Sequence, residues 1–345
     1  MLSDESILDM ALRVFYPIRR LKWHYRSRHE SLIAFSNQHF YDSSLTIFPS
    51  PNNQFAVDYR YITEGSYSSG SNSPEAKTVA EAAAAFMRQS PHLSLGIVTL
   101  NQKQQQLLLD EMDTLFAENP DLDAYCTTRE DTLEPFFVKN LENVQGDERD
   151  VIFISTVYGP EGPGEKVNQR FGPITTRNGH RRLNVLFTRA KEKIVVFSSM
   201  KPTDIRPGPT SNPGVWILKA YLDYAQSQTL QVSTDMGSEL MGDFELFLAE
   251  KLQQQGYEVV PRVGVSGYFI DLAIVHPKRP GTYLLGLECD GETYHSSEAA
   301  RDRDRLRQQV LERLGWTLYR IWTPDWFTNP TAELQKLNRY ISTLI

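Results

Sequence analysis

Cysteine is scarce in this chain of 345 residues, which contains Cys126 and Cys289 and no other. Two cysteines cannot build a disulfide framework, and they favour a protein of the reducing cytoplasm. No apolar run reaches the roughly 18 residues of a membrane helix, so no membrane association is expected. The acidic start MLSDESILDMALRVF indicates an amphipathic helix rather than a signal peptide. The net charge of −7 excludes attraction of the whole surface to nucleic acid, which leaves local basic patches as the means of binding.

Alternating strands and helices fill the first two thirds of the sequence. Dense runs of β-branched residues predict three strands, at 94–100, 150–158 and 193–199. Such continuous apolar runs are typical of a parallel sheet that is covered on both faces. Helices are predicted at 73–90, with Ser73 as the N-cap, and at 102–116. The alternation predicts an α/β domain.

A second unit begins near residue 242. Its elements are predicted in this order: a helix at 243–255, strands at 257–263, 267–276 and 283–289, a helix at 296–315 and a strand at 317–322. This pattern again predicts an α/β fold, built on a smaller sheet.

Acidic residues interrupt the apolar strands of this second unit. Asp271 lies in the middle of one strand and Glu288 ends the next, so neighbouring strands could bring both carboxylates together. With the backbone carbonyl of Cys289 they would form an oxygen-rich site for Mg²⁺ or Mn²⁺. Glu245 could reach this site directly or through water, and His295 could protonate a leaving oxygen or position water. The alternative is a set of solvated acids and an ordinary histidine, against which stands the cost of burying an unpaired carboxylate in an apolar strand.

Four stretches of the second unit carry a family resemblance: GYFIDLAIVHP, LECDGETYHSS, ARDRDRLRQQVLERLGW and RIWTPDWF. With the order of elements, they resemble the PD-(D/E)xK endonuclease superfamily over residues 242–330. The resemblance is to the branch of the very-short-patch repair endonucleases, and in particular to the small domain fused to bacterial helicases. Asp290 stands where the superfamily has its usual catalytic lysine. That branch relies on histidine instead, which fits His295.

Arginines alternate with aspartates on the predicted helix at 296–315. The basic residues are Arg301, Arg303, Arg305 and Arg307. They form either a solvated, salt-bridged face or a strip that positions phosphates, and the sequence does not decide between the two. Trp322 and Trp326 could stack on bases, although core packing is favoured for Trp322.

Polar motifs mark the first unit as well. They are HYRSRH at 24–29, GIVTLNQKQ at 96–104, VQGDERD at 144–150 and RRLNVLFTRAK at 181–191. Arg182 and Arg189 are seven residues apart, which would place them on one face of a helix. Arginines in a packed segment usually meet fixed anions, such as carboxylates or phosphates.

Together these motifs resemble the second RecA-like domain of superfamily 1 helicases, in the branch of the nonsense-mediated-decay helicase. The first, third and fourth resemble helicase motifs IV, V and VI. The resemblance implies ATP as a cofactor, with Tyr25 stacked on adenine and Glu148 in contact with the ribose. It also implies that Arg26 and Arg189 contact the γ-phosphate, and Arg182 lies in the same motif as Arg189.

The helicase resemblance also implies nucleic-acid contacts. Thr99 and Gln102 would contact the strand backbone, and Gln145 would link the nucleotide and nucleic-acid sites. DNA is the expected partner, and RNA is not excluded. No G-x-x-x-x-G-K-[ST] P-loop and no Walker-B strand occurs in the sequence. The first RecA-like domain is therefore expected elsewhere, in a longer protein or in a separate chain.

The sequence thus predicts a RecA-like parallel-sheet domain at 1–225, a linker at 226–241 and a restriction-endonuclease-like domain at 242–345. The predicted function is metal-dependent cleavage of DNA, coupled in the whole protein to ATP-driven unwinding or translocation. The alternative is a non-catalytic module whose nuclease fold only grips DNA. The combination of Asp271 and Glu288 with His295 favours catalysis. A place in DNA repair or in defence against foreign DNA follows from fold-level association alone.

Overall fold

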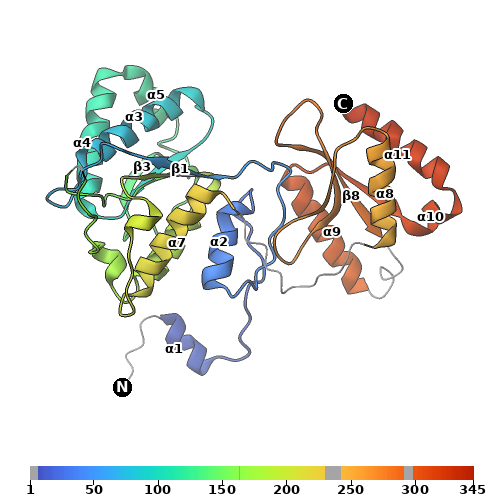
Figure 1. Ribbon diagram of the computed structural model, residues 1–345, viewed down its shortest axis with the longest axis horizontal. Helices are drawn as coiled ribbons and strands as arrows, with labels where there is room; N and C mark the ends of the chain where they lie inside the picture. The colour runs from blue at the N-terminus through green and yellow to red at the C-terminus, as the bar shows by residue number, and fades with distance from the viewer. Residues whose placement is uncertain (1–6, 163, 230–241, 291–297) are drawn as a thin grey trace.

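A computed structural model describes residues 7–162, 164–229, 242–290 and 298–345 of the chain. Two separate sheets organise these residues, and they lie side by side in Figure 1. The predicted α/β class is confirmed: a parallel five-stranded sheet comes first, and a four-stranded sheet follows near the C-terminus. We call the two parts the N-terminal unit, up to residue 229, and the C-terminal unit, from residue 242. Among the described residues, no helix combines the length and the apolar character needed to cross a membrane.

The sheet of the N-terminal unit has the order β1-β5-β4-β2-β3, and all neighbouring strands are parallel. Its strands are β1 Val57–Tyr61, β2 Leu95–Thr99, β3 Phe137–Asn140, β4 Arg149–Ser155 and β5 Ala190–Ser198. The sequence pattern predicts β2, β4 and β5 but not β1 or β3. Strand β1 lies at the edge and is half polar, and β3 has only four residues, so neither shows a continuous apolar run.

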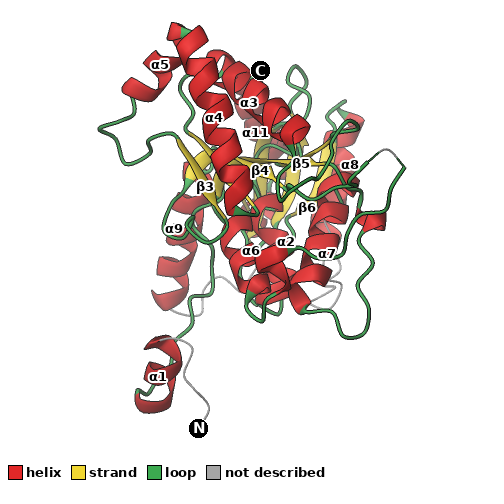
Figure 2. Cartoon of the chain, turned by 90° about the vertical axis from the view of Figure 1, so that its left-hand side faces the viewer, coloured by secondary structure: helices red, strands yellow, loops and turns green. Residues whose placement is uncertain are grey.

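Helices cover both faces of this sheet (Figure 2). The covering helices are α2 Ser31–Phe40, α3 Ser73–Gln89, α4 Gln102–Glu118, α5 Pro120–Thr127, α6 Gly179–Phe187 and α7 Pro213–Ser227, with short 3₁₀ turns at Gly172–Thr175 and Pro202–Asp204. Helix α1 Ile7–Val14 lies away from the sheet (Figure 1). Ile152 packs in one core with α2, α6 and α7, whereas Val151 and Phe153 pack in a second core with α3, α4 and α5. Alternate side chains of β4 therefore serve two cores, as expected of a buried parallel sheet.

Two local predictions are wrong. The N-cap of α3 is Asn72 rather than Ser73, because the Asn72 side chain accepts the Glu75 backbone N–H. Both residue types are good N-caps, so sequence preference did not separate them. Helix α6 ends at Phe187, so Arg189 lies beyond it and does not share a helix face with Arg182.

The C-terminal unit confirms the predicted order of elements. It contains α8 Asp243–Gln254, β6 Val259–Val263, β7 Ile270–Val275, β8 Tyr283–Asp290, α9 Glu298–Arg313, β9 Leu318–Trp322, α10 Thr323–Thr328 and α11 Pro330–Leu344. Strands β6, β7 and β8 are antiparallel neighbours, and β9 lies parallel to β8. Helices α8, α10 and α11 share one core with the sheet, and α9 shares a core on the other side. Trp326 is buried, at 3% exposure, whereas Trp322 is 39% exposed. The expectation that Trp322 packs in the core is therefore wrong.

Residues 45–54, between α2 and β1, pack against the C-terminal unit. The blue trace that follows α2 runs to that unit in Figure 1. The hydrogen bonds across the contact are Ile47 N to Ser266 O at 2.9 Å, Tyr283 N to Pro51 O at 2.8 Å and Trp316 Nε1 to Pro49 O at 2.8 Å. Phe48 is buried in the same core as Leu311 and Trp316. A segment of the N-terminal unit thereby completes a core that the sequence assigns to the C-terminal unit alone.

Candidate functional site

The carboxylates of Asp271 and Glu288 lie on the neighbouring strands β7 and β8. Leu272 pairs with Leu287 in the antiparallel register, so the next pair along the strands is Asp271 and Glu288. Directly opposite residues project from the same face of a sheet. Asp271 Oδ2 also accepts the backbone N–H of Cys289 at 2.7 Å. The structure therefore brings these two acids together at the end of β8.

Both oxygens of Glu288 have partners from other elements. The Tyr268 hydroxyl donates to Oε1, and Arg320 Nη2 on β9 lies 3.0 Å from Oε2. The Glu288 side chain is 15% exposed, so this ion pair is partly shielded from water. Burial, and then the Glu288 carboxylate, raise the pKa of Tyr268 far above that of a free tyrosine, so its hydroxyl remains a donor. Tyr268 and Arg320 lie in stretches that carry the family resemblance, but no role could be assigned to them from the sequence, because their contacts depend on strand pairing and on a loop.

The described part of this carboxylate site supplies two of the hard oxygen ligands that Mg²⁺ and Mn²⁺ prefer. Among the described residues, no group of three His, Cys, Asp or Glu is arranged to hold a metal ion. Glu245, in the first turn of α8, lies against Gly242 and does not complete such a group with Asp271 and Glu288. The side chain of Asp290 and the whole of His295 lie outside the described residues, so their roles stay predictions.

Helix α9 places Arg307 next to the carboxylate site. The guanidinium carbon of Arg307 lies 5.7 Å from the centroid of the Tyr268 ring. Arg305, two residues earlier, is exposed. The side chains of Arg301 and Arg303 lie outside the described residues. The phosphate-binding strip therefore stays a prediction, with Arg307 beside the tyrosine that donates to Glu288.

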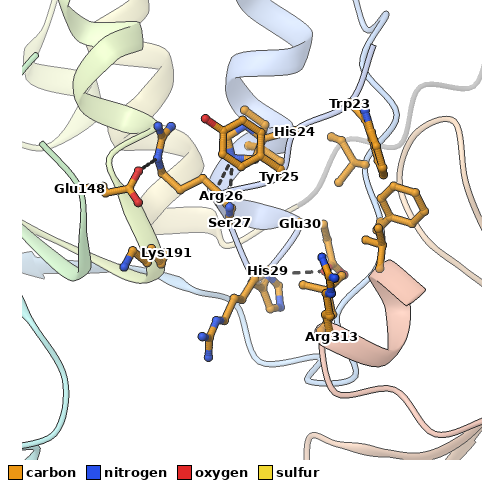
Figure 3. Close-up of a pocket in the computed structure, with 16 residues that line it drawn as sticks. Trp23, His24, Tyr25, Arg26, Ser27, His29, Glu30, Glu148, Lys191 and Arg313 are labelled. Carbon is orange, nitrogen blue, oxygen red and sulfur yellow. Dashed lines mark hydrogen bonds and ion pairs between the residues drawn. The ribbon is translucent and has the colours of Figure 1, made fainter. Parts of the chain in front are cut away.

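A second charged cluster joins residues 24–29 to the turn before β4 (Figure 3). Arg26 Nε donates to Glu148 Oε2, and Nη1 donates to the Thr188 carbonyl at 3.1 Å. The hydrogen bond from Arg26 lowers the pKa of Glu148. Arg189 Nη2 donates to the Thr188 hydroxyl at 3.2 Å, so both guanidinium groups contact Thr188, and burial and then the Arg26 charge lower the pKa of Arg189. This convergence of positive charge suits an anion.

Aromatic residues flank the same cluster. The Tyr25 side chain is 81% exposed, and its ring is stacked 6.3 Å from the His24 ring. Burial, with the charges of Arg26 and Arg189, lowers the pKa of His24 to about 4, so His24 is neutral near pH 7. A cavity of about 560 Å³ opens beside these residues, and Arg313 at the end of α9 also lines it (Figure 3). The cavity therefore lies where the two units meet.

The remaining predicted site residues of the N-terminal unit lie apart from this cluster of hydrogen bonds. Arg182 forms an ion pair with Glu142 at 2.8 Å. Gln145 is exposed in the turn before β4, and Gln102 is exposed at the start of α4. Thr99 is fully buried and donates its hydroxyl to the Asn101 carbonyl at 2.7 Å. A direct contact between that hydroxyl and nucleic acid would require this hydrogen bond to break.

A buried acid that the sequence pattern did not single out lies at the carboxyl end of the first sheet, where open α/β sheets bind ligands. Glu75 is 0% exposed. Its Oε1 accepts from Val157 N and Ser155 Oγ, each at 2.7 Å, and its Oε2 accepts from Ser199 Oγ at 2.8 Å. Burial raises the pKa of Glu75 to about 7, and these hydrogen bonds oppose the rise. A sequence feature that could have pointed to Glu75 is its position three residues after Asn72, the N-cap of α3.

Each of the two units matches a known protein family. Residues 3–201 match the AAA_12 family, described as an AAA domain, and residues 244–341 match the REase_MTES_1575 family. The fold and these matches define a superfamily 1 helicase-like domain followed by a nuclease-like domain. The AAA_12 match spans more than half of the chain, and the chain belongs to that family.

Two curated relatives extend this comparison. The uncharacterized ATP-dependent helicase MG140 of Mycoplasma genitalium is 28% identical over 334 residues, which are 92% of this chain and 29% of the relative. Its homologue in Mycoplasma pneumoniae is 27% identical over 348 residues, covering 93% of this chain and 30% of that protein. The chain thus spans under a third of the length of these relatives.

Among solved structures, the C-terminal domain of a possible DNA helicase from Lactobacillus plantarum WCFS1 shows a weak likeness. It covers 57% of this chain and 96% of its own, at 13% identity and a TM-score of 0.28. A TM-score this low supports no conclusion about the fold.

Glu75 generates a prediction about pH. Its pKa is raised from 4.5 to about 7 in the folded protein, so its contribution to stability is present below pH 4.5 and is lost as the pH rises through 7. Glu75→Gln should remove this loss, which amounts to roughly 3 kcal/mol for a shift of this size. We expect the free energy of unfolding to fall more between pH 4.5 and pH 8 in the wild type than in the variant, as measured by urea denaturation.

The matched control is Glu81→Gln, an exposed glutamate on the same helix. It should keep the pH dependence of the wild type. An identical pH dependence for Glu75→Gln and wild type would show that Glu75 titrates normally.

Proposed function

We propose that this chain is the C-terminal part of a helicase-nuclease. The C-terminal unit cleaves DNA phosphodiester bonds with the help of a divalent cation. The N-terminal unit forms half of an ATP site, and a first RecA-like domain, in the same chain or in a partner, supplies the other half. In the whole protein, ATP-driven unwinding or translocation is coupled to cleavage. The observation that carries the nuclease proposal is the pair of acids, Asp271 and Glu288, at the end of β8.

The residues of the carboxylate site have distinct roles in this proposal. Asp271, Glu288 and the Cys289 carbonyl hold Mg²⁺ or Mn²⁺, which would neutralise the charge that develops on the scissile phosphate. The Cys289 N–H fixes the orientation of the Asp271 carboxylate. His295 delivers a proton to the leaving oxygen or positions water, and Asp290 takes the place of the superfamily's lysine. Glu245, in the first turn of α8, acts on this site directly or through water.

The basic residues of α9 bind the DNA backbone in this proposal. Arg307 contacts the Tyr268 ring, and Arg305 continues the strip along the exposed helix. Such contacts fix the position of DNA without reading its sequence. RNA would satisfy the same contacts. The competing function is a non-catalytic module that grips DNA through these arginines, and a test of cleavage separates the two.

The ATP half-site consists of the cluster around Arg26 in this proposal. The exposed Tyr25 ring stacks on adenine, and Arg26 and Arg189 contact the γ-phosphate. Arg26 uses Nε and Nη1 for protein partners, which leaves Nη2 without one among the residues that the structure describes. Glu148 holds Arg26 until nucleotide arrives and then contacts the ribose. Gln145, three residues earlier, links this half-site to the nucleic acid bound near Gln102.

The first test replaces one acid. Asp271→Asn removes a charge that the cation needs, but keeps an oxygen that can accept the Cys289 N–H. We expect Mg²⁺-dependent or Mn²⁺-dependent cleavage of labelled DNA to fall by more than about 100-fold, because loss of an outer-shell residue alone costs 10–100-fold. The melting temperature without metal should stay within a few degrees, since the lost interaction is about 1 kcal/mol or less.

The control for this test is Asp325→Asn, which changes an exposed acid on α10 of the same unit. It should cleave at the wild-type rate. Wild-type protein that binds DNA but shows no metal-dependent cleavage would establish the gripping module instead.

The second test concerns ATP. The chain has no P-loop, so it should hydrolyse no ATP alone, with or without DNA. When a P-loop domain completes the site, Arg26→Ala should lower DNA-stimulated hydrolysis by about 10³-fold or more, the usual contribution of an arginine finger. Arg60→Ala, at an exposed position of β1, should leave the rate unchanged. Substantial DNA-stimulated hydrolysis by this chain alone would contradict the half-site.

A further inference from the structure

The N-terminal unit holds the loop that carries Tyr268. This loop, residues 264–269, connects β6 to β7, and its Ser266 carbonyl accepts the Ile47 N–H at 2.9 Å. Gly267 has φ +73°, and a Cβ at this position would lie 3.0 Å from the Thr46 Cα. Only glycine combines this backbone conformation with such a close approach. The course of the loop therefore depends on residues 45–54 of the N-terminal unit.

The Tyr268 ring contacts side chains from the segment 45–54 and from helix α9. Phe48 is 8% exposed, and its ring centroid lies 5.2 Å from that of Tyr268. The guanidinium of Arg307 on α9 lies 5.7 Å from the same ring. Tilted aromatic pairs and cation–π contacts at these distances are attractive and depend on orientation. The ring therefore has a defined position that the N-terminal unit helps to set.

The hydroxyl at the end of this ring meets the carboxylate site. It donates to Glu288 Oε1, while Arg320 contacts Glu288 Oε2 at 3.0 Å. A carboxylate oxygen has two lone pairs, so Oε1 can accept a hydrogen bond from the tyrosine hydroxyl and still face a cation. A neutral donor of this kind orients a ligand without competing for it by charge, unlike Arg320. Outer-shell donors of this type tune the affinity of metal ligands.

We propose that Tyr268 is a positioning residue of the nuclease site, and that Phe48 of the N-terminal unit keeps it in place. Tyr268 holds the Glu288 carboxylate in the orientation that binds the divalent cation. The C-terminal unit therefore depends on the N-terminal unit for its cation site as well as for its core. This inference rests on the proposed metal-dependent function of Asp271 and Glu288, and it adds a dependence that reaches across the two units.

The test measures Mn²⁺ binding to the full chain without DNA, by calorimetry and by the Mn²⁺-induced rise in melting temperature. Tyr268→Phe keeps the ring and removes only the hydroxyl. We expect the Mn²⁺ concentration for half-saturation to rise by about 10-fold or more, as for other outer-shell residues. The Mn²⁺ concentration for half-maximal DNA cleavage should rise in parallel. At saturating Mn²⁺ the cleavage rate should recover to that of the wild type, because the catalytic groups are intact.

A second variant tests the contribution of the N-terminal unit. Phe48→Leu keeps an apolar side chain in the core but removes the ring that meets Tyr268. It should weaken Mn²⁺ binding in the same direction as Tyr268→Phe, with a folded circular dichroism spectrum. The matched control is Tyr319→Phe, which removes a tyrosine hydroxyl from β9, where the ring packs against Tyr340 instead. It should bind Mn²⁺ like the wild type.

The outcomes separate this inference from the proposed function. If the wild type binds Mn²⁺ and cleaves DNA while Tyr268→Phe has the same half-saturation, the positioning role is overturned and the nuclease stands. If Tyr268→Phe weakens binding but folded Phe48→Leu does not, the dependence on the N-terminal unit is overturned. If the wild type binds no Mn²⁺ and cleaves no DNA, the proposed function fails, and the inference fails with it.

Discussion

The packing of residues 45–54 on the C-terminal unit is the contact on which the rest of the structure depends. Backbone hydrogen bonds join Ile47 to Ser266 and Pro51 to Tyr283 across the contact, and Phe48 fills the core next to Trp316. Burial of a phenylalanine contributes roughly 1.5–3 kcal/mol, and each hydrogen bond adds about 1 kcal/mol. These contributions are large beside the 5–15 kcal/mol that typically separates folded from unfolded protein. The contact therefore favours one cooperative body over two units on a flexible linker.

This contact also connects the two candidate sites in space. Phe48 touches Tyr268, whose hydroxyl reaches Glu288, and the Trp23 ring lies 5.6 Å from the Phe48 ring. Trp23 and Phe48 line the cavity beside Tyr25 and Arg26 as well. The Arg26 cluster and the carboxylate site thus both border the aromatic contacts of Phe48.

Both sites hold a carboxylate against an arginine. Glu288 pairs with Arg320, and Glu148 pairs with Arg26, in partly buried surroundings. Removing one partner of such a pair leaves an uncompensated charge, which is costly where water is excluded. A ligand that separates either ion pair must therefore compensate the charge that it leaves unpaired. In the proposed function, a cation faces Glu288 Oε1 while Arg320 stays on Oε2, and a phosphate meets Arg26 through Nη2. The electrostatics of each pair are thus compatible with the ligand that we propose for it.

Sequence patterns were sufficient for the strands with continuous apolar runs and for the order of elements in the C-terminal unit. They were insufficient where contacts between distant parts of the chain determine the local structure. Strand β1 is half polar, and the choice of Asn72 over Ser73 as N-cap follows from buried partners that local preference does not encode. Asp271 stood out as an acid in an apolar strand, but Tyr268 and Arg320 reach Glu288 only through the loop and the strand pairing. The role of Phe48 could not be predicted, because it lies more than 200 residues from Tyr268 in the chain.

The cooperative joining of the two units is tested most directly by native-state hydrogen exchange of the full chain. The amides of Ile47 and Tyr283 donate across the contact, to Ser266 and Pro51. If the units form one body, these amides should open with the same free energy as the amides of strand β7, because only global unfolding releases them. If they exchange as fast as exposed turns while β7 stays protected, the contact is not cooperative. The account of a shared core would then be contradicted.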